Sequence, residues 1–269
     1  MLGKPALSTG VAAGVGLIAI GPNVLAFGRV LRTARGTWTV GLDHFVLGDV
    51  TALRRFADSF PELESDDCYV CVEADGVGRM LVDAPTTDLT SGIIVELHVA
   101  APLPLAEARK LFDATLRGPD LAFDLSGDEP DLDPMGTEVS GPDTIAQTLM
   151  MHLSTCKGGY AVGGEHGSRV AEFNERLGPE HITSIIAVET IRLATVLHKG
   201  AVLKRWFTPF DFVERVRAVR LLPTASAEFL KVAILLDVHG LEAATEFVVP
   251  ISTSTRHLGI PPLLMLPDP

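Results

Sequence analysis

The chain contains little cysteine, few aromatic side chains and a deficit of basic residues. Its 269 residues include three cysteines, two tryptophans and two tyrosines. Three cysteines cannot build the disulfide framework of a small secreted protein, so a reducing compartment is expected. With 34 acidic and 22 basic side chains, the formal net charge is −12. This balance argues against a general nucleic-acid coat protein, because phosphate binding needs clustered lysine and arginine.

The apolar content is high despite this charge. Hydrophobic residues make up 47% of the chain and the mean hydropathy is +0.30, which excludes an intrinsically disordered protein. The charge is also uneven. Residues 1–57 hold six basic and two acidic side chains, residues 58–143 hold four and twenty, and residues 144–269 hold twelve of each. Such asymmetry predicts at least two structural units, with a boundary in the acidic, Gly- and Pro-containing stretch 120–143.

The fold class predicted from the hydrophobic patterns is α+β: an N-terminal α+β unit followed by a helical segment packed on an antiparallel C-terminal sheet. The predicted divisions are an apolar N-terminal arm at 1–36, an acidic α+β domain at 37–128, a second domain at 129–253 and a C-terminal tail at 254–269.

In the first half, Asp49 is expected to cap a helix, and Asp75-Gly76 to turn a hairpin. The predicted elements are one or two strands in 37–47, a helix from Asp49 to Phe56, strands at 68–73, 79–82 and 93–100, and a helix at 104–116.

In the second half, helices are expected to precede an antiparallel meander, with His239-Gly240 turning its last pair of strands. The predicted elements are a helix opening at Pro142–Thr144 with Ile145, Leu149 and Leu153 on one stripe, a short helix capped by Ser168, the longest helix from Pro179 to about His198, and strands at 213–222, 229–238 and 246–251.

Residues 5–28 form an uncharged run of 24 positions, long enough to span a bilayer. Five glycines and Pro22-Asn23 make it a poor membrane helix, so an arm held by a partner chain is preferred and a membrane anchor stays an alternative. The run also includes Thr9-Gly10 through Gly16, a glycine pattern typical of dinucleotide-binding turns. Without a preceding strand and a following helix, that pattern does not predict a cofactor site.

No catalytic, cofactor-binding or metal-ligating residue is predicted. Cys68 and Cys71 supply two ligands where structural zinc needs four, so they are interpreted as small hydrophobic residues of a sheet. The acids at 124–133 lack the spacing of a calcium-binding loop, so a solvated acidic loop is expected. Glu165-His166-Gly167-Ser168 could host acid–base chemistry, and an enzyme with a site at 152–169 remains an alternative.

One stretch carries a more specific pattern. It runs through Asp131-Leu-Asp-Pro-Met-Gly136, Val139-Ser-Gly141, Asp143-Thr-Ile-Ala-Gln147, Leu153-Ser-Thr155, Lys157-Gly158 and Glu165-His-Gly-Ser-Arg169. In these residues, and over roughly 130–250, the chain resembles the gp25-like baseplate-wedge proteins of contractile phage tails, which are not enzymes. The chain departs from that family in having no Glu-Pro-Arg triplet near 191–198 and in a longer turn at 158–164.

The resemblance implies a structural virion component of the tail baseplate, without enzymatic activity or cofactors, assembled in the host cytoplasm. It implies other baseplate and tail proteins as partners, in several copies, with neither nucleic acid nor membrane. Strand addition at the edge of the 213–251 meander would suit such assembly. The candidate partner-contact residues are Gln147, Lys157, Arg169, Arg192, Phe247 and Val249.

Overall fold

The computed structural model describes residues 15–64, 67–100, 120–133, 136–158, 166–177, 179–199 and 206–254. The chain divides into two compact units, Met1–Pro102 and Leu103–Pro269, here termed unit 1 and unit 2. Antiparallel sheets and helices occur together, which confirms the α+β prediction. The division falls after residue 102 rather than after 128. The helix expected at 104–116 and the tail beyond residue 254 lie outside the described residues.

Unit 1 is built on one antiparallel sheet in the order β5-β4-β1-β2-β3-β7-β6. Its strands are β1 (Gly16–Ile20), β2 (Val24–Ala34), β3 (Thr37–Leu47), β4 (Tyr69–Val72), β5 (Val77–Met80), β6 (Thr86–Asp88) and β7 (Ile93–His98).

This sheet closes on itself between β5 and β7. Leu81, just after β5, pairs with Val99, just after β7. The Val82 N–H donates to the His98 carbonyl at 2.9 Å, and the Ala100 N–H donates to the Met80 carbonyl at 2.9 Å. The chain from β5 to β6 therefore pairs first with β4 and then with β7, and the closed sheet surrounds an apolar core.

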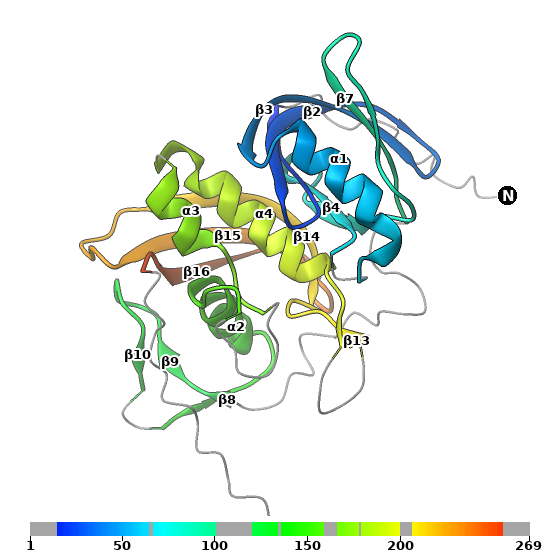
Figure 1. Cartoon of the computed structure of the whole chain (residues 1–269). Helices are drawn as coiled ribbons and strands as arrows, with labels where there is room; N and C mark the ends of the chain where they lie inside the picture. Colours follow the sequence, from blue (N-terminus) through cyan, green and yellow to red (C-terminus); the bar gives the residue numbers. More distant parts are fainter. Residues whose placement is uncertain are drawn as a thin grey trace, which may run out of the picture. The chain divides into compact units, whose positions relative to one another are not determined.

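Helix α1 (Val50–Ser59) packs against that core, beside the strands of unit 1 (Figure 1). Asp49 begins the helix as predicted, because its Oδ1 accepts the Ala52 N–H at 2.7 Å. Leu53 and Phe56 are buried on the face toward the sheet. The hairpin at Asp75-Gly76 is confirmed too, since Gly76 adopts φ 68° between β4 and β5.

The uncharged N-terminal run differs from the expectation of an arm over its described part. Residues 16–20 and 24–34 form β1 and β2, which are joined by a turn at Gly21–Asn23 and lie inside the sheet of unit 1. All five residues of β1 are buried. The glycine and proline that interrupt the run supply a hairpin turn. No described helix is both long and apolar enough to cross a membrane.

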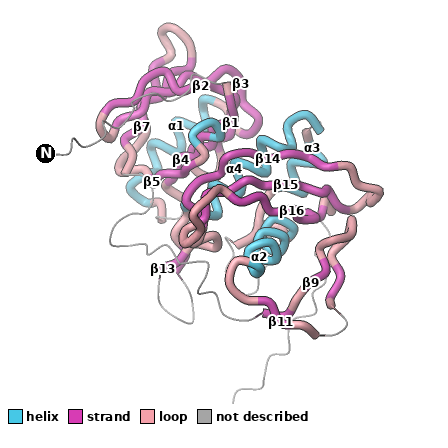
Figure 2. Tube along the Cα trace, turned by 180° about the vertical axis from the view of Figure 1, so that it is seen from behind, coloured by secondary structure: helices cyan, strands magenta, loops and turns pink. Residues whose placement is uncertain are grey.

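Unit 2 packs helices on a three-stranded sheet of order β14-β15-β16. Figure 2 shows α4 running along β14 and α2 along β16. The elements are α2 (Asp143–Ser154), α3 (Val170–Arg176), α4 (Ile182–Thr195), β14 (Val213–Leu222), β15 (Phe229–Val238) and β16 (Thr245–Ser252).

Short elements complete the part of the chain that the structure describes. They are the 3-10 helices η1 (Phe60–Glu62), η2 (Glu73–Asp75) and η4 (Pro179–His181), and the paired two-residue strands β8 (Asp120–Leu121) with β11 (Glu138–Val139), β9 (Phe123–Asp124) with β10 (Asp131–Leu132), and β12 (His198–Lys199) with β13 (Trp206–Phe207).

The predicted order of helices followed by a meander is confirmed in unit 2. Ile145, Leu149 and Leu153 are all buried on α2, and β14 and β15 have the predicted bounds. Gly240 turns the last strand pair with φ 91°. The longest described helix, α4, ends at Thr195 rather than near His198, because Val196 is extended and His198–Lys199 pairs with β13.

Candidate functional site

A buried charged centre joins α4 to the turn that precedes α3. The Glu189 carboxylate accepts from the Arg192 guanidinium, with Oε2 at 2.8 Å from Nη2 and 3.1 Å from Nε. It also accepts the Arg169 N–H at 3.1 Å, and the Arg169 Nε lies 3.6 Å from Oε1. Glu189 and Arg192 are 2% and 3% exposed, so one carboxylate is held between two guanidinium groups away from water.

The two arginines decide the charge state of Glu189. Burial acts to raise the pKa of this carboxyl, but the charges of Arg192 and Arg169 and their hydrogen bonds outweigh it and lower the pKa from 4.5 to about 2. Glu189 is therefore ionised at neutral pH. At pH 7 the carboxylate has no proton to donate and is a weak base, and its oxygens are engaged by the two arginines, so the contacts observed here hold α4 to the turn before α3.

Gly167 completes this centre through its backbone. Its carbonyl accepts from Arg192 Nη2 at 2.5 Å. The residue has φ 90°, and an added Cβ would lie 2.6 Å from the carbonyl oxygens of both Thr155 and Cys156. Only glycine fits here, which explains why the Gly-Ser-Arg sequence stands at this turn.

Gln147 connects α2 to the acidic loop. Its side chain is 2% exposed and its Oε1 accepts the Phe123 N–H of β9 at 2.6 Å. The glutamine of the Asp143–Gln147 motif thus fixes a strand within unit 2.

The six candidate contact residues lie mostly inside unit 2. Gln147, Arg192, Phe247 and Val249 are buried, so a partner cannot reach these side chains in this conformation. Lys157 and Arg169 are half-buried. The structure brings Arg169 and Arg192 together at Glu189, whereas the other four occupy separate places. Sequence analysis did not single out Glu189, although its spacing of three from Arg192 on a helix was a usable signal.

The two outer edges of the three-stranded sheet, on β14 and β16, differ in the backbone and side-chain groups that they present. Within the described part of the chain, β14 pairs only with β15, so its other edge has no strand beside it. Arg217 and Arg220 of β14 reach across the sheet to Asp237 at 2.7 Å and to Glu246 at 2.6 Å. On β16, by contrast, Pro250 lacks an N–H and the Ser252 N–H donates to Ser154 Oγ. Among the described residues both outer edges lack a neighbouring strand, and the β16 edge is partly obstructed at Pro250 and Ser252.

Of the residues of the enzyme alternative, Ser168 is hydrogen-bonded to backbone groups. The Ser168 hydroxyl is buried, donates to the Leu153 carbonyl at 2.6 Å and accepts the Val170 N–H at 3.3 Å. The rings of His152 and His166 stack at 5.9 Å. Burial and the charge of Arg192 lower the pKa of His166. Glu165 lies outside the described residues. A serine committed to two backbone groups is not available as a nucleophile.

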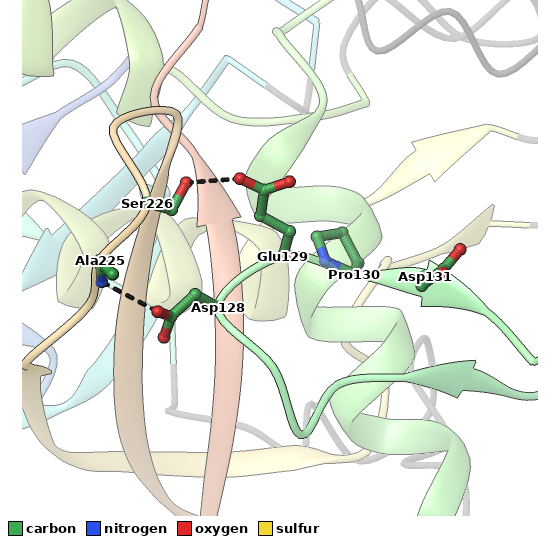
Figure 3. Close-up of a pocket in the computed structure, with 6 residues that line it drawn as sticks. All are labelled: Asp128, Glu129, Pro130, Asp131, Ala225 and Ser226. Atoms are coloured by element: carbon green, nitrogen blue, oxygen red, sulfur yellow. Dashed lines mark hydrogen bonds between the residues drawn. The ribbon is translucent and has the colours of Figure 1, made fainter.

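A polar pocket of about 650 Å³ lies between the acidic loop and the turn that joins β14 to β15 (Figure 3). Asp128 Oδ2 accepts the Ala225 N–H at 2.9 Å, and Ser226 Oγ donates to Glu129 Oε1 at 3.0 Å. Lys231 Nζ donates to the Ser126 carbonyl at 3.1 Å. The acids of this loop thus attach it to the sheet of unit 2, in addition to facing solvent as predicted.

Metal chemistry finds no support in the part of the chain that the structure describes. No group of three or more His, Cys, Asp or Glu side chains there is placed to hold a metal ion. Cys68, just before β4, and Cys71, within it, are buried and form no disulfide, as interpreted from the sequence. Cys156 forms no disulfide either, and burial raises the pKa of its thiol.

Comparison with known proteins assigns no family to the chain. No protein-family model, curated protein or solved structure matches it. Functional conclusions therefore depend on the geometry above and on the pattern in residues 130–250.

Proposed function

We propose that the protein is a structural component of a bacteriophage tail, a baseplate wedge subunit that joins tube, sheath and neighbouring wedge proteins. The observation that carries the proposal is the use of the motif residues. Gln147, Gly167 and Arg169, which carry the resemblance to gp25-like proteins, all hold unit 2 together and none faces an open reaction site. A motif with this role fits a family whose members are not enzymes.

The element order supports the same proposal. The motif residues fall on β10, β11, α2 and the turn before α3, and they are followed by α3, α4 and a three-stranded antiparallel sheet. The family's Glu-Pro-Arg triplet is absent as a contiguous sequence, but α4 carries a glutamate and an arginine three positions apart, and they form the buried pair Glu189–Arg192.

The open edge of β14 is the proposed attachment point for a neighbouring tail protein. A strand added to this edge would pair through main-chain hydrogen bonds, which depend little on side-chain identity. The exposed charges Arg217 and Arg220 lie on this strand, and such charges on an edge oppose indiscriminate pairing.

The proposal is tested on particles produced by the strain that encodes the chain. Tail particles are purified through a density gradient and each fraction is probed for this protein. We expect it to sediment with intact tails, and we expect deletion of its gene to stop tail assembly. Tails that assemble fully without the protein would contradict the proposal. Loss of a turnover activity in His152→Ala or His166→Ala, with assembly intact, would favour the enzyme alternative.

A further inference from the structure

The sheet of unit 1 has an outer face on which charges are sorted by strand. Val30, Val40 and Val95 point toward the core, so their neighbours on β2, β3 and β7 point outward. The outer face, as used here, is formed by the outward side chains of β2, β3, β7 and β6: Arg29, Leu31, Arg32, Thr39, Gly41, Ile94, Glu96, Thr86 and Asp88.

A bulge in β2 gathers its basic residues on this face. Arg29 pairs with Gly41 and Arg32 pairs with Thr39, with a register shift between Val30 and Arg32. Without the extra residue, positions three apart on a strand would point to opposite faces. Both arginines are exposed, and among the described residues neither guanidinium group has an ion-pair or hydrogen-bond partner.

The opposite margin of the outer face is acidic. Glu96 pairs with Thr39 on one side and Thr86 on the other, and Asp88 pairs with Ile94. Asp88 is exposed and its Oδ1 accepts from the Thr90 N–H at 2.9 Å and hydroxyl at 2.8 Å. Nearby, His98 Nδ1 lies 2.8 Å from Asp83, and its Nε2 lies 3.4 Å from Glu96. Three carboxylates and one histidine thus border β7 and β6.

Among the described residues no ion pair joins the basic and acidic columns of one chain. Adjacent strands are about 4.8 Å apart, so Arg29 and Asp88, three strands apart, are separated by roughly 14 Å along the sheet, and Arg32 and Glu96, two strands apart, by roughly 10 Å. Between them lie small or apolar residues, Thr39, Gly41 and Ile94. The exposed Leu31 side chain covers Gly41, since a Cβ added there would be 3.2 Å from Leu31 Cδ1.

We propose that the outer face binds the outer face of a second copy of this chain. A two-fold axis parallel to the strands, between β3 and β7, turns β2 of one copy onto β6 of the other. Arg29 then faces Asp88 of the second copy, and Arg32 lies beside the second copy's Thr86 and Glu96. Each column meets its opposite charge twice, while Leu31 and Ile94 supply apolar contact at the centre. This inference uses unit 1 alone and does not depend on the proposed wedge function.

Charge reversal in the full-length chain tests this interface by sedimentation velocity. The wild-type protein should self-associate at about 10 mM ionic strength, where the Debye length is about 30 Å, and should dissociate at about 1 M, where it is about 3 Å. Arg29→Glu/Arg32→Glu makes the face wholly acidic, and Asp88→Arg/Glu96→Arg makes it wholly basic. For each variant alone, the dissociation constant of self-association should rise about tenfold. An equimolar mixture of the two variants should form a one-to-one complex.

Matched controls separate the interface from the net charge. Arg54→Glu/Arg55→Glu on α1 and Glu62→Arg/Glu64→Arg after it make the same charge changes at exposed positions off the outer face. They should associate as the wild type does. Circular dichroism and thermal unfolding verify that each variant folds, and Thr86→Arg/Glu96→Arg replaces the basic variant if Asp88 proves necessary for folding.

Three outcomes would overturn the inference. One is a wild-type chain that stays monomeric at low salt and high concentration. Another is a mixture of the two variants that fails to pair. The third is binding of a DNA duplex, without self-association, that Arg29→Glu/Arg32→Glu abolishes, because the basic column would then serve a polyanion.

Discussion

Unit 1 and unit 2 differ in what they bury. The core of unit 1 is apolar, and none of its described polar or charged residues is fully buried. Among the described residues of unit 2, ten polar or charged ones are buried, including the ionised Glu189 and Arg192, and the half-buried Arg169 completes their cluster. An apolar core gains stability in proportion to buried area, whereas a buried ion cluster is stable only while every member is present. The two units should therefore respond differently to the same kind of change.

Removing the charge of Glu189 should have the largest effect. Glu189→Gln leaves Arg192 buried beside Arg169 without a counter-charge, and we expect a loss of about 3–5 kcal/mol in the free energy of unfolding of unit 2. Denaturant unfolding measures the loss, and hydrogen exchange locates it on α4. The control Glu172→Gln breaks the exposed pair with Arg176 and should cost about 0–0.5 kcal/mol. A loss in unit 1 as large as that in unit 2 would contradict the contrast between the units.

A cavity in the core of unit 1 should have a comparable or smaller effect. Leu97 is fully buried on β7, and Leu97→Ala should cost about 2–5 kcal/mol by lost burial and an unfilled cavity. Trp38 is buried in the same core, so its fluorescence in a Trp206→Phe background reports on unit 1. Leu89 is 42% exposed, and Leu89→Ala should change stability by less than about 0.5 kcal/mol. Equal effects at the two leucines would refute the assignment of the core.

In the wild-type protein, lowering the pH should destabilise unit 2 through protonation of Glu189, a group that unit 1 lacks. The pKa of Glu189 is about 2 in the folded chain and 4.5 without the folded environment. Ionised Glu189 therefore contributes its full stabilisation of the fold above pH 4.5. That contribution, about 3 kcal/mol, is lost as the pH falls from about 4.5 through 2. Hydrogen exchange at a series of pH values should show α4 losing protection in this window. The Glu189→Gln variant should lack the loss, and an identical acid response in that variant would exclude Glu189 as its source.

The cap of α1 should have the smallest effect. Asp49→Ala removes the acceptor for the Ala52 N–H and should cost about 1 kcal/mol, read by thermal unfolding of unit 1. The exposed Asp58, near the end of the same helix, serves as the matched control, because Asp58→Ala loses no cap and relieves a charge near the negative end of the helix dipole. A larger loss at Asp58 than at Asp49 would contradict the capping role.

The sequence predicted elements well where a local signal marked them. Asp49, Asp75-Gly76 and His239-Gly240 each set a boundary through chemistry that acts within a few residues. The strands 213–222 and 229–238 were predicted with their observed bounds. In the described part of the run at 5–28, the structure has strands where the sequence predicts an arm, because a short strand buried on both faces has the same composition as a segment of an apolar helix or arm.

The candidate site is harder to predict from the sequence than the secondary structure. Arg169 and Arg192 were selected as surface contacts, yet both serve Glu189 inside unit 2. Nothing in the spacing of residues 169 and 189 indicates that they meet, because the turn at Gly167 and the packing of α3 against α4 bring them together. Asp128 and Ala225 are likewise joined across a separation of 97 residues.

The sequence by itself determined the α+β class, the acidic middle of the chain and most boundaries in the C-terminal half, because periodicity, caps and turns act locally. Only the tertiary structure decided that residues 16–28 of the uncharged run enter a closed sheet, that Arg169 joins Glu189 and Arg192 in one buried centre, and that a bulge brings the basic residues of β2 onto one face. Those features depend on contacts between residues far apart in the chain, and burial gives such contacts most of their energy.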